Sequence, residues 1–498
     1  MFLMIVFLSC GTVSLFLLYH ALISMVRPKN FPPGPVGLPF VGSLHYIAPT
    51  FNKNIQQMAN VYGKIFSVKL KSMNFVCLCD YDLIKEYMVD NPKPFAMRPK
   101  LFLYELMRGP GLDGIVVSPY GAKLAAHRKL FHAFLRKHGC GDKLFCKVEQ
   151  ELPYFVANIQ DQLKLTSTFD PTSAFEYAAL NVIACYVFGN RYNYGDDKFK
   201  MLLNHNKQFF QKVENVYSPA VTLVSLIPHL HNLWLPKAAK DLKECCRAIE
   251  DFISCEVEYH KSTLDAKNPR DIIDMYLNEM SHSRSEHFTD KGLKMTIMDF
   301  FQAGTETTSV TLKWAVIYMV NNPEIQERVQ QEIDKVLGLH KLPTYEDRLK
   351  MPYTEATILE VQRKANIAPI GVLHSTSESV KLGGFDLPKD TCIIPLYHSI
   401  HYSQKHWKNP NQFDPENFLD LNGKVGTRPA FMPFGGGLRI CLGMNIAKQE
   451  LFLFFAAMLQ HFKLLPPTGI LKLDEQYVNG GTLHPKEYNI LLEDRCKS

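Results

Sequence analysis

A single cysteine late in the chain, Cys441, has the surroundings of a reactive thiolate. It lies in the run FGGGLRICLG at 434–443, between glycines and two residues after Arg439. Glycines let backbone N–H groups approach a sulfur closely. Apolar residues at helical spacing over 446–462 predict a helix whose N-terminus would stabilise an anionic sulfur. The pattern favours a thiolate that binds a metal, with a buried, unreactive cysteine as the alternative.

Polar residues interrupt an apolar stretch in the middle of the chain. The spacing of apolar residues predicts a helix over Met295–Val320, and the run Ala303-Gly304-Thr305-Glu306-Thr307-Thr308 lies inside it. A carboxylate within an apolar helix requires partners or water, because burying a charge is costly. A hydroxyl beside a small residue can open the helix locally and hold a water. The pattern indicates a functional site, with threonine packing or back-bonding as the alternative.

An acid and a base share one face of another predicted helix. Glu360 and Arg363 are three residues apart on a helix expected to begin near Tyr353 and to run into Pro369. By itself this spacing describes a surface ion pair worth less than about 1 kcal/mol.

Together, and in this order, the three patterns resemble the cytochrome P450 family of haem-thiolate monooxygenases, most of all its animal microsomal branch. The resemblance extends from a Pro-rich segment near residue 31 to about residue 493. It implies a mainly α-helical body with a minor β-sheet, the cytochrome P450 fold, around haem b (iron protoporphyrin IX). It makes Cys441 the axial ligand of the haem iron, with a thiolate that favours O–O cleavage. The matching residues around it, which would contact the cofactor, are Phe434, Gly437, Arg439 and Gly443.

The same resemblance implies roles for other side chains. Thr307 would hydrogen-bond dioxygen and its water at the haem, and Glu306 would feed protons to that site. Glu360 and Arg363 would lie buried beneath the haem and hold the cysteine loop to the core. The basic residues that match propionate-contacting positions are Arg98, Arg128, His374 and Arg439.

Two positions depart from the common pattern of the family. Leu124 stands where many members have tryptophan, and leucine cannot donate the indole N–H bond to a propionate. Asn417 stands where many members have arginine, so it brings no charge to the network of Glu360 and Arg363. The resemblance therefore leaves the iron ligand intact and changes the outer contacts.

The N-terminal segment has the length and composition of a membrane anchor. Its first 26 residues contain no Lys, Arg, Asp or Glu, and a helix of that length exceeds the roughly 30 Å hydrocarbon core of a bilayer. We expect a transmembrane helix at 1–26, a Pro-rich hinge at 27–40 and the catalytic domain at 41–498, with a cleaved signal peptide as the alternative. Arg27 and Lys29 follow the span, which predicts a cytosolic catalytic domain. The resemblance implies a single-pass protein of the endoplasmic reticulum.

Composition and charge limit the other function classes. The chain has 498 residues, of which 46% are hydrophobic, and its formal net charge of +6 gives no reason to expect nucleic acid. Its 12 cysteines have no regular spacing, which favours a reducing compartment. His398, His401 and His406 lack the cysteine or carboxylate spacing of a zinc site.

The expected reaction inserts one oxygen atom from O2 into a lipophilic steroid, fatty acid or xenobiotic, with water as the other product. No dinucleotide or flavin motif is visible, so the resemblance implies electrons from NADPH–cytochrome P450 reductase, with cytochrome b5 as a further partner. Lys123, Lys129, Arg136 and Lys137 are candidates for the docking surface, with a merely solvated face as the alternative. The segments expected to line the substrate pocket are 100–117 and 205–235, including Phe209, Phe210, Tyr217 and Trp234.

Two other functions stay open at this point. A haem-thiolate isomerase or dehydratase would rearrange peroxides without external electrons, although Glu306 and Thr307 would then have no proton relay to serve. A membrane-tethered haem carrier or sensor would show no turnover. Oxygen and NADPH consumption separates both from a monooxygenase.

Overall fold

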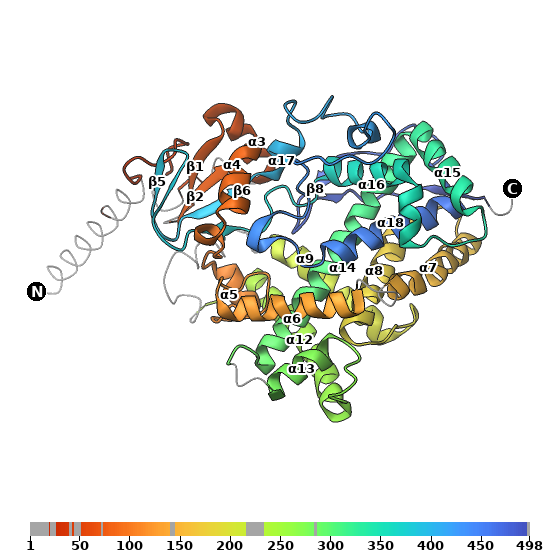
Figure 1. The fold of residues 1–498 in the computed structure, drawn as a ribbon, viewed down its shortest axis with the longest axis horizontal. Coiled ribbons are helices and arrows are strands. Elements are labelled where there is room, and N and C mark those ends of the chain that lie inside the picture. The colour runs from red at the N-terminus through yellow and green to blue at the C-terminus, as the bar shows by residue number, and fades with distance from the viewer. Residues whose placement is uncertain are drawn as a thin grey trace, which may run out of the picture.

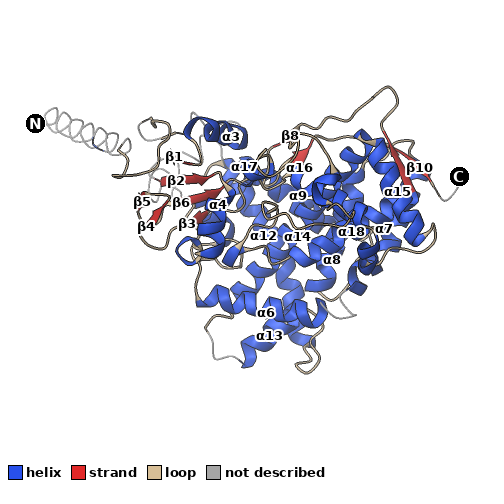
Figure 2. Ribbon diagram, turned by 45° about the horizontal axis from the view of Figure 1, so that its top comes forward, coloured by secondary structure: helices blue, strands red, loops and turns tan. Residues whose placement is uncertain are grey.

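Helices make up most of the structure, and most of the strands gather at one end of it (Figures 1 and 2). The computed structural model describes residues 19, 26–38, 42–43, 51–70, 73–139, 145–215, 234–282 and 286–495. The helices are α3 (Phe51–Tyr62), α4 (Tyr81–Ile84), α5 (Phe102–Arg108), α6 (Ala122–Gly139), α7 (Phe145–Leu165), α8 (Pro171–Val187), α9 (Asp197–Asn215), α12 (Lys237–Thr263), α13 (Ile272–His282), α14 (Asp290–Asn321), α15 (Pro323–Leu337), α16 (Pro352–Ala365), α17 (Tyr397–His401) and α18 (Met444–His461). The predicted mainly helical body with a minor sheet is confirmed.

The largest sheet joins two distant parts of the chain. Its strand order is β1-β2-β6-β3, formed by Ile65–Leu70, Met73–Leu78, Cys392–Pro395 and His374–Ser375. β1 and β2 are an antiparallel hairpin, whereas β2 and β6 are parallel and so require a long connection. Three two-stranded sheets complete the set: β4 with β5 (Val380–Leu382, Phe385–Leu387), β7 with β10 (Phe462–Leu465, Leu491–Asp494) and β8 with β9 (Tyr477–Val478, His484–Pro485).

The central helix α14 passes through the middle of the helical body (Figure 1). It begins after Thr289, whose side chain accepts a hydrogen bond from the N–H of Gly292 and so satisfies a free donor of the first turn. At its other end, the Asn321 amide donates to the carbonyl of Leu473 at 3.0 Å. Most of its side chains are buried because other elements cover it on several sides, α8 and α12 among them. The predicted helix is confirmed, and it is longer at both ends.

Two more predicted helices position the candidate site. α18 agrees with the expected 446–462 helix to within two residues and packs against α14. α16 carries Glu360 and Arg363 but stops well before the predicted end at Pro369. Asn366 closes it in the left-handed conformation, with φ of 42°, and its N–H bonds to the carbonyl of Gln362. An asparagine in this conformation ends a helix as effectively as a proline.

The expected membrane anchor at 1–26 lies outside the described residues, apart from Tyr19 and Val26. Within the described part of the chain, no helix is long and apolar enough to cross a membrane. The expected hinge is described over 27–38, and its prolines lie against β1: the Ser67 hydroxyl donates to the carbonyl of Pro32 at 2.7 Å. The Pro-rich segment is therefore attached to the sheet.

Candidate active site

The loop before α18 holds Cys441 through its glycines. The N–H of Cys441 donates to the carbonyl of Phe434 at 3.0 Å, which closes the loop. Gly437 has φ of +63°, and a Cβ at this position would lie 1.9 Å from the carbonyl oxygen of Met88. Only glycine fits there. Gly443 is different, because it caps α18 with φ of −86° and a Cβ there would meet no protein atom within 4 Å.

The side chain of Cys441 is exposed, although protein atoms surround its other sides. Burial raises the pKa of its thiol, while the N–H of Gly443 and the charge of Arg128 lower it; the net shift is upward. The metal-binding thiolate that the sequence indicates at Cys441 stays a prediction. Metal coordination deprotonates a thiol outright, so the site suits a metal-bound sulfur.

Four basic side chains lie close to one another beside the cysteine loop. All four bond to backbone carbonyls: Arg98 to Val116, Val372 and Leu373; Arg128 to Ile440; Arg439 to Ala96, Ile115 and Ser118; His374 to Phe95. Among the described residues, no carboxylate forms an ion pair with any of the four. The cluster therefore holds three arginines and a histidine, each buried or half-buried, and none of them has a counter-charge among the described residues.

The lowered pKa values of this cluster show that its positive charges repel one another. Burial, together with the charges of Arg98 and Arg128, lowers the pKa of Arg439 to about 8. Burial likewise lowers the pKa of Arg98 to about 10. The pKa of His374 falls well below its usual value through burial and through Arg98. An anionic ligand would relieve this mutual repulsion.

One stripe of α14 is accessible in the middle of a buried helix. Ala303 is exposed, and Gly304 and Thr307 are half-buried, whereas their neighbours Thr305 and Glu306 are buried. The helix is unbroken here, and the Thr307 hydroxyl donates to the carbonyl of Ala303 at 2.7 Å. The back-bonding alternative is thus realised, and it leaves a small, polar stripe along this face of α14.

Glu306 points to partners that the sequence did not indicate. Its Oε1 lies 2.6 Å from Nε2 of His484, and the Thr482 hydroxyl donates to the same oxygen at 3.3 Å. The expected requirement of a buried carboxylate for partners is confirmed. His484 was missed because it lies in no motif, and its only signal was the unpaired acid on a distant helix.

A second acid on the back of α14 belongs to α18. The Thr308 hydroxyl donates to Oε2 of Glu450 at 2.7 Å. Glu450 is 1% exposed, and burial raises its pKa to about 8, although Thr308 opposes this shift. The carboxyl group is therefore mainly protonated at neutral pH, and it joins α14 to the helix that follows Cys441.

Glu360 and Arg363 are fully buried, so the surface alternative is wrong. Arg363 donates to both Glu360 oxygens at 2.7 Å and to three carbonyls of the segment that leads to the cysteine loop: His401 at 2.7 Å, Pro410 at 2.9 Å and Gln412 at 3.1 Å. The amide of Asn417 donates weakly to Glu360 at 3.4 Å, so the third partner is kept without its charge.

Other predicted residues divide between the site and the surface. Leu124 is fully buried in the core. Leucine needs no hydrogen-bond partner there, whereas the indole N–H of a tryptophan would need an acceptor. Lys123 pairs with Asp113, while Lys129 is exposed. Phe209 is buried and Phe210 is partly buried, whereas Trp234 is 49% exposed. The side chains of Arg136 and Lys137, as well as Tyr217, lie outside the described residues.

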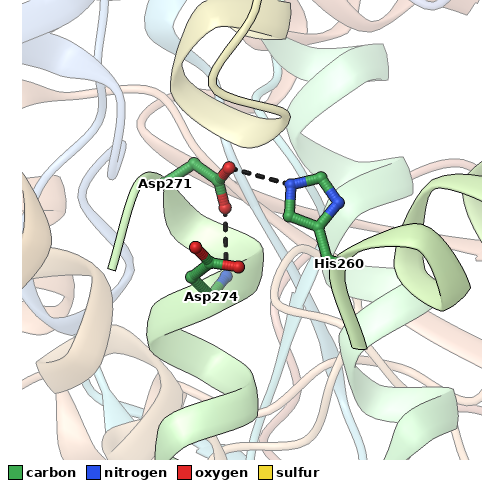
Figure 3. A group of neighbouring side chains, drawn as sticks. All are labelled: His260, Asp271 and Asp274. Atoms are coloured by element: carbon green, nitrogen blue, oxygen red, sulfur yellow. Dashed lines mark hydrogen bonds and ion pairs between the residues drawn. The ribbon is translucent and has the colours of Figure 1, made fainter. Parts of the chain in front are cut away.

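A separate group, His260, Asp271 and Asp274, has the spacing of metal ligands (Figure 3). Nδ1 of His260 bonds to the carbonyl of Glu256, Nε2 bonds to Asp271 at 2.9 Å, and Arg270 pairs with Asp274 at 2.6 Å. Burial lowers the pKa of His260, but the hydrogen bond and charge of Asp271 raise it more. Because these bonds already use the ligand atoms, the group is a charged clamp between α12 and α13.

Comparison with known proteins decides the family. The cytochrome P450 family model matches residues 32–492. The chain belongs to the cytochrome P450 family. It is 36% identical to cytochrome P450 2B19 of Mus musculus over 480 residues, covering 94% of this chain and 95% of that protein. It is 35% identical to cytochrome P450 2B15 of Rattus norvegicus (95% and 96% covered) and 33% identical to cytochrome P450 2U1 of Homo sapiens (98% and 93% covered).

This P450 is accordingly an oxidoreductase, a monooxygenase with haem as its cofactor. The described residues fit that cofactor. Haem carries two propionates. The cluster of Arg98 and His374, which are buried, and Arg128 and Arg439, which are half-buried, lacks an anion among the described residues. Cys441 offers an accessible sulfur beside this cluster, since Arg128 bonds to the carbonyl of Ile440 at 2.8 Å.

Proposed function

We propose that this P450 inserts one oxygen atom from O2 into a lipophilic steroid, fatty acid or xenobiotic. The observation that carries the proposal is the partly buried basic cluster beside the accessible sulfur of Cys441. The bound haem supplies dioxygen activation at its thiolate-ligated iron. Cys441 is the iron ligand, and Arg98, Arg128, His374 and Arg439 hold the propionates.

The accessible stripe of α14 handles protons. Reducing the second oxygen atom of O2 to water consumes two electrons and two protons. Thr307 presents its hydroxyl on this stripe and holds a proton donor at the reaction site, and the neighbouring Glu306 supplies the protons. Glu360 and Arg363 have a structural role, because they fix the carbonyls of the segment before the cysteine loop.

Apolar side chains of α5 and α9 form the substrate wall. Phe210 belongs to α9 and lies against Gly481, where a Cβ would approach its ring to 2.8 Å. This contact places α9 next to the segment whose Thr482 and His484 bind the carboxylate of Glu306. An apolar wall with few polar groups beside it suits a lipophilic substrate.

Electrons come from NADPH through cytochrome P450 reductase, with cytochrome b5 as a second donor. The exposed Lys129 on α6 belongs to the docking face, while Lys123 is neutralised by Asp113. The anchor at 1–26 holds the protein in the membrane of the endoplasmic reticulum, single-pass, and the hinge at 27–40 leads to a cytosolic catalytic domain at 41–498.

The reduced, carbon-monoxide-bound spectrum tests the iron ligand. We expect the red-shifted Soret band of a thiolate ligand in the native enzyme and its loss in Cys441→Ala. Cys255→Ala is the control, because Cys255 is an exposed cysteine on α12. A Cys441→Ala enzyme that kept the band would refute the ligand assignment. Product formation that requires O2, NADPH and reductase, rather than a hydroperoxide alone, tests the reaction.

A further inference from the structure

The carboxylate of Glu306 is bound from the C-terminal part of the chain by a histidine. Nε2 of His484 and the hydroxyl of Thr482 both contact Oε1 of Glu306, at 2.6 and 3.3 Å. The hydroxyl also lies 3.2 Å from the same imidazole nitrogen, so the three polar groups form a closed triangle. Glu306 is buried, whereas the side chain of His484 is 26% exposed.

The segment around His484 is fixed on α14. The indole N–H of Trp314 donates to the carbonyl of Leu483 at 2.9 Å, and the N–H of Leu483 donates to the carbonyl of Ile367 at 2.8 Å. His484 itself pairs in register with Val478 between β8 and β9. These bonds fix the backbone on both sides of His484, and so they hold the imidazole beside the carboxylate of Glu306.

The other charged groups near Glu306 interact mainly with one another. Glu176 of α8 lies close enough for its charge and that of Glu306 to repel, and Lys313, further along α14, lies 3.8 Å from Glu176. Lys207 of α9 also acts on Glu176 by its charge. Of the described groups around Glu306, His484 is the imidazole in contact with it, and its side chain is also partly exposed to solvent.

We propose that His484 is the proton-relaying and positioning partner of Glu306. This inference rests on the proposed proton-delivery role of Glu306. A proton on Nε2 of His484 passes to Oε1 of Glu306 along the 2.6 Å contact, and the neutral imidazole takes another proton from solvent. Glu306 then delivers its proton on the side of α14 where Thr307 stands. Thr482 holds both partners in place.

The test compares His484→Gln with Glu306→Gln in the reconstituted holoenzyme. Glutamine can still hydrogen-bond to Glu306 but cannot relay a proton. We expect product formed per NADPH to fall roughly 10-fold in His484→Gln, with hydrogen peroxide released instead. This is less than the ~100-fold or more that a general acid acting directly on the reacting group contributes. In Glu306→Gln we expect a similar or larger fall, and the double variant should be no worse than Glu306→Gln.

Two further measurements separate a relay from simple support of the fold. The solvent isotope effect on product formation should rise in His484→Gln. In thermal unfolding, followed without substrate, His484→Gln should melt close to the native enzyme, because glutamine can still hydrogen-bond to Glu306; a purely structural role would instead lower stability and activity together. His461→Gln is the control, since His461 is half-buried on the far end of α18 and bonds to the carbonyl of Ala457.

The outcomes are distinguishable. If Glu306→Gln lowers the yield of product while His484→Gln behaves like His461→Gln, the relay is wrong and the role of Glu306 stands. If Glu306→Gln itself leaves yield and isotope effect unchanged, the proposed proton delivery fails, and this inference fails with it.

Discussion

Replacing Arg363 by lysine keeps the positive charge but removes the planar, fork-shaped guanidinium group. The guanidinium makes five hydrogen bonds, two to Glu360 and three to carbonyls. An ammonium has three donors, so at least two buried acceptors lose their partner. Each unsatisfied acceptor costs about 1–3 kcal/mol, which gives a loss of about 2–6 kcal/mol. The unfolding entropy of a chain of this length is about 1 kcal/mol/K, so the melting temperature should fall by roughly 2–6 °C.

Thermal unfolding of the holoenzyme, followed by the Soret band and by circular dichroism, measures this shift. Arg328→Lys is the matched control, because Arg328 pairs with Glu416 at 2.6 Å but its side chain is 54% exposed. A surface pair of this kind is worth at most about 1 kcal/mol, so the control should melt within about 1 °C of the native enzyme. If Arg363→Lys melts no lower than Arg328→Lys, the claim that the fork holds the segment before the cysteine loop is refuted.

Gly437→Ala should prevent formation of the cysteine loop, because its Cβ would overlap the carbonyl of Met88, whereas the circular dichroism of Gly443→Ala should match the native protein. The pKa of His260 is higher in the folded state than in the unfolded chain, so its protonation stabilises the fold below about pH 6.5. This stabilisation is lost as the pH rises through the pKa of the folded state. The difference in melting temperature between the native enzyme and His260→Gln should therefore shrink from pH 6 to 8.5. Glu450 titrates at about 8 in the fold and near 4.5 when unfolded, so the native enzyme loses stability across that interval. The free energy of unfolding of Glu450→Gln, measured in urea, should therefore rise relative to that of the native enzyme between pH 5 and 8. If the two free energies change with pH in parallel, the raised pKa of Glu450 is contradicted.

Local patterns predicted the helices that carry the candidate site. The helical spacing around Glu306 and the motif around Cys441 lie within short stretches, and the structure places both in the expected elements. Burial is harder to predict, because it depends on distant parts of the chain. The surface alternative for Glu360 and Arg363 was wrong for this reason.

Long-range partners could not be predicted at all. Thr482 is 176 residues from Glu306 in sequence, and neither it nor His484 belongs to a recognisable motif. The same holds for the three carbonyls bound by Arg363, because a backbone acceptor has no sequence signature. A buried charge without a local partner therefore indicates only that a partner exists.

The attachment of the Thr482–His484 segment to α14 also has a consequence for biosynthesis. Glu306 leaves the ribosome 176 residues before Thr482, which at 5–20 residues per second corresponds to roughly 10–35 s. During this interval the nascent central helix carries a carboxylate without its histidine, and the apolar side chains around it lack part of their cover. Transiently exposed apolar surface of this kind is what chaperones bind during synthesis.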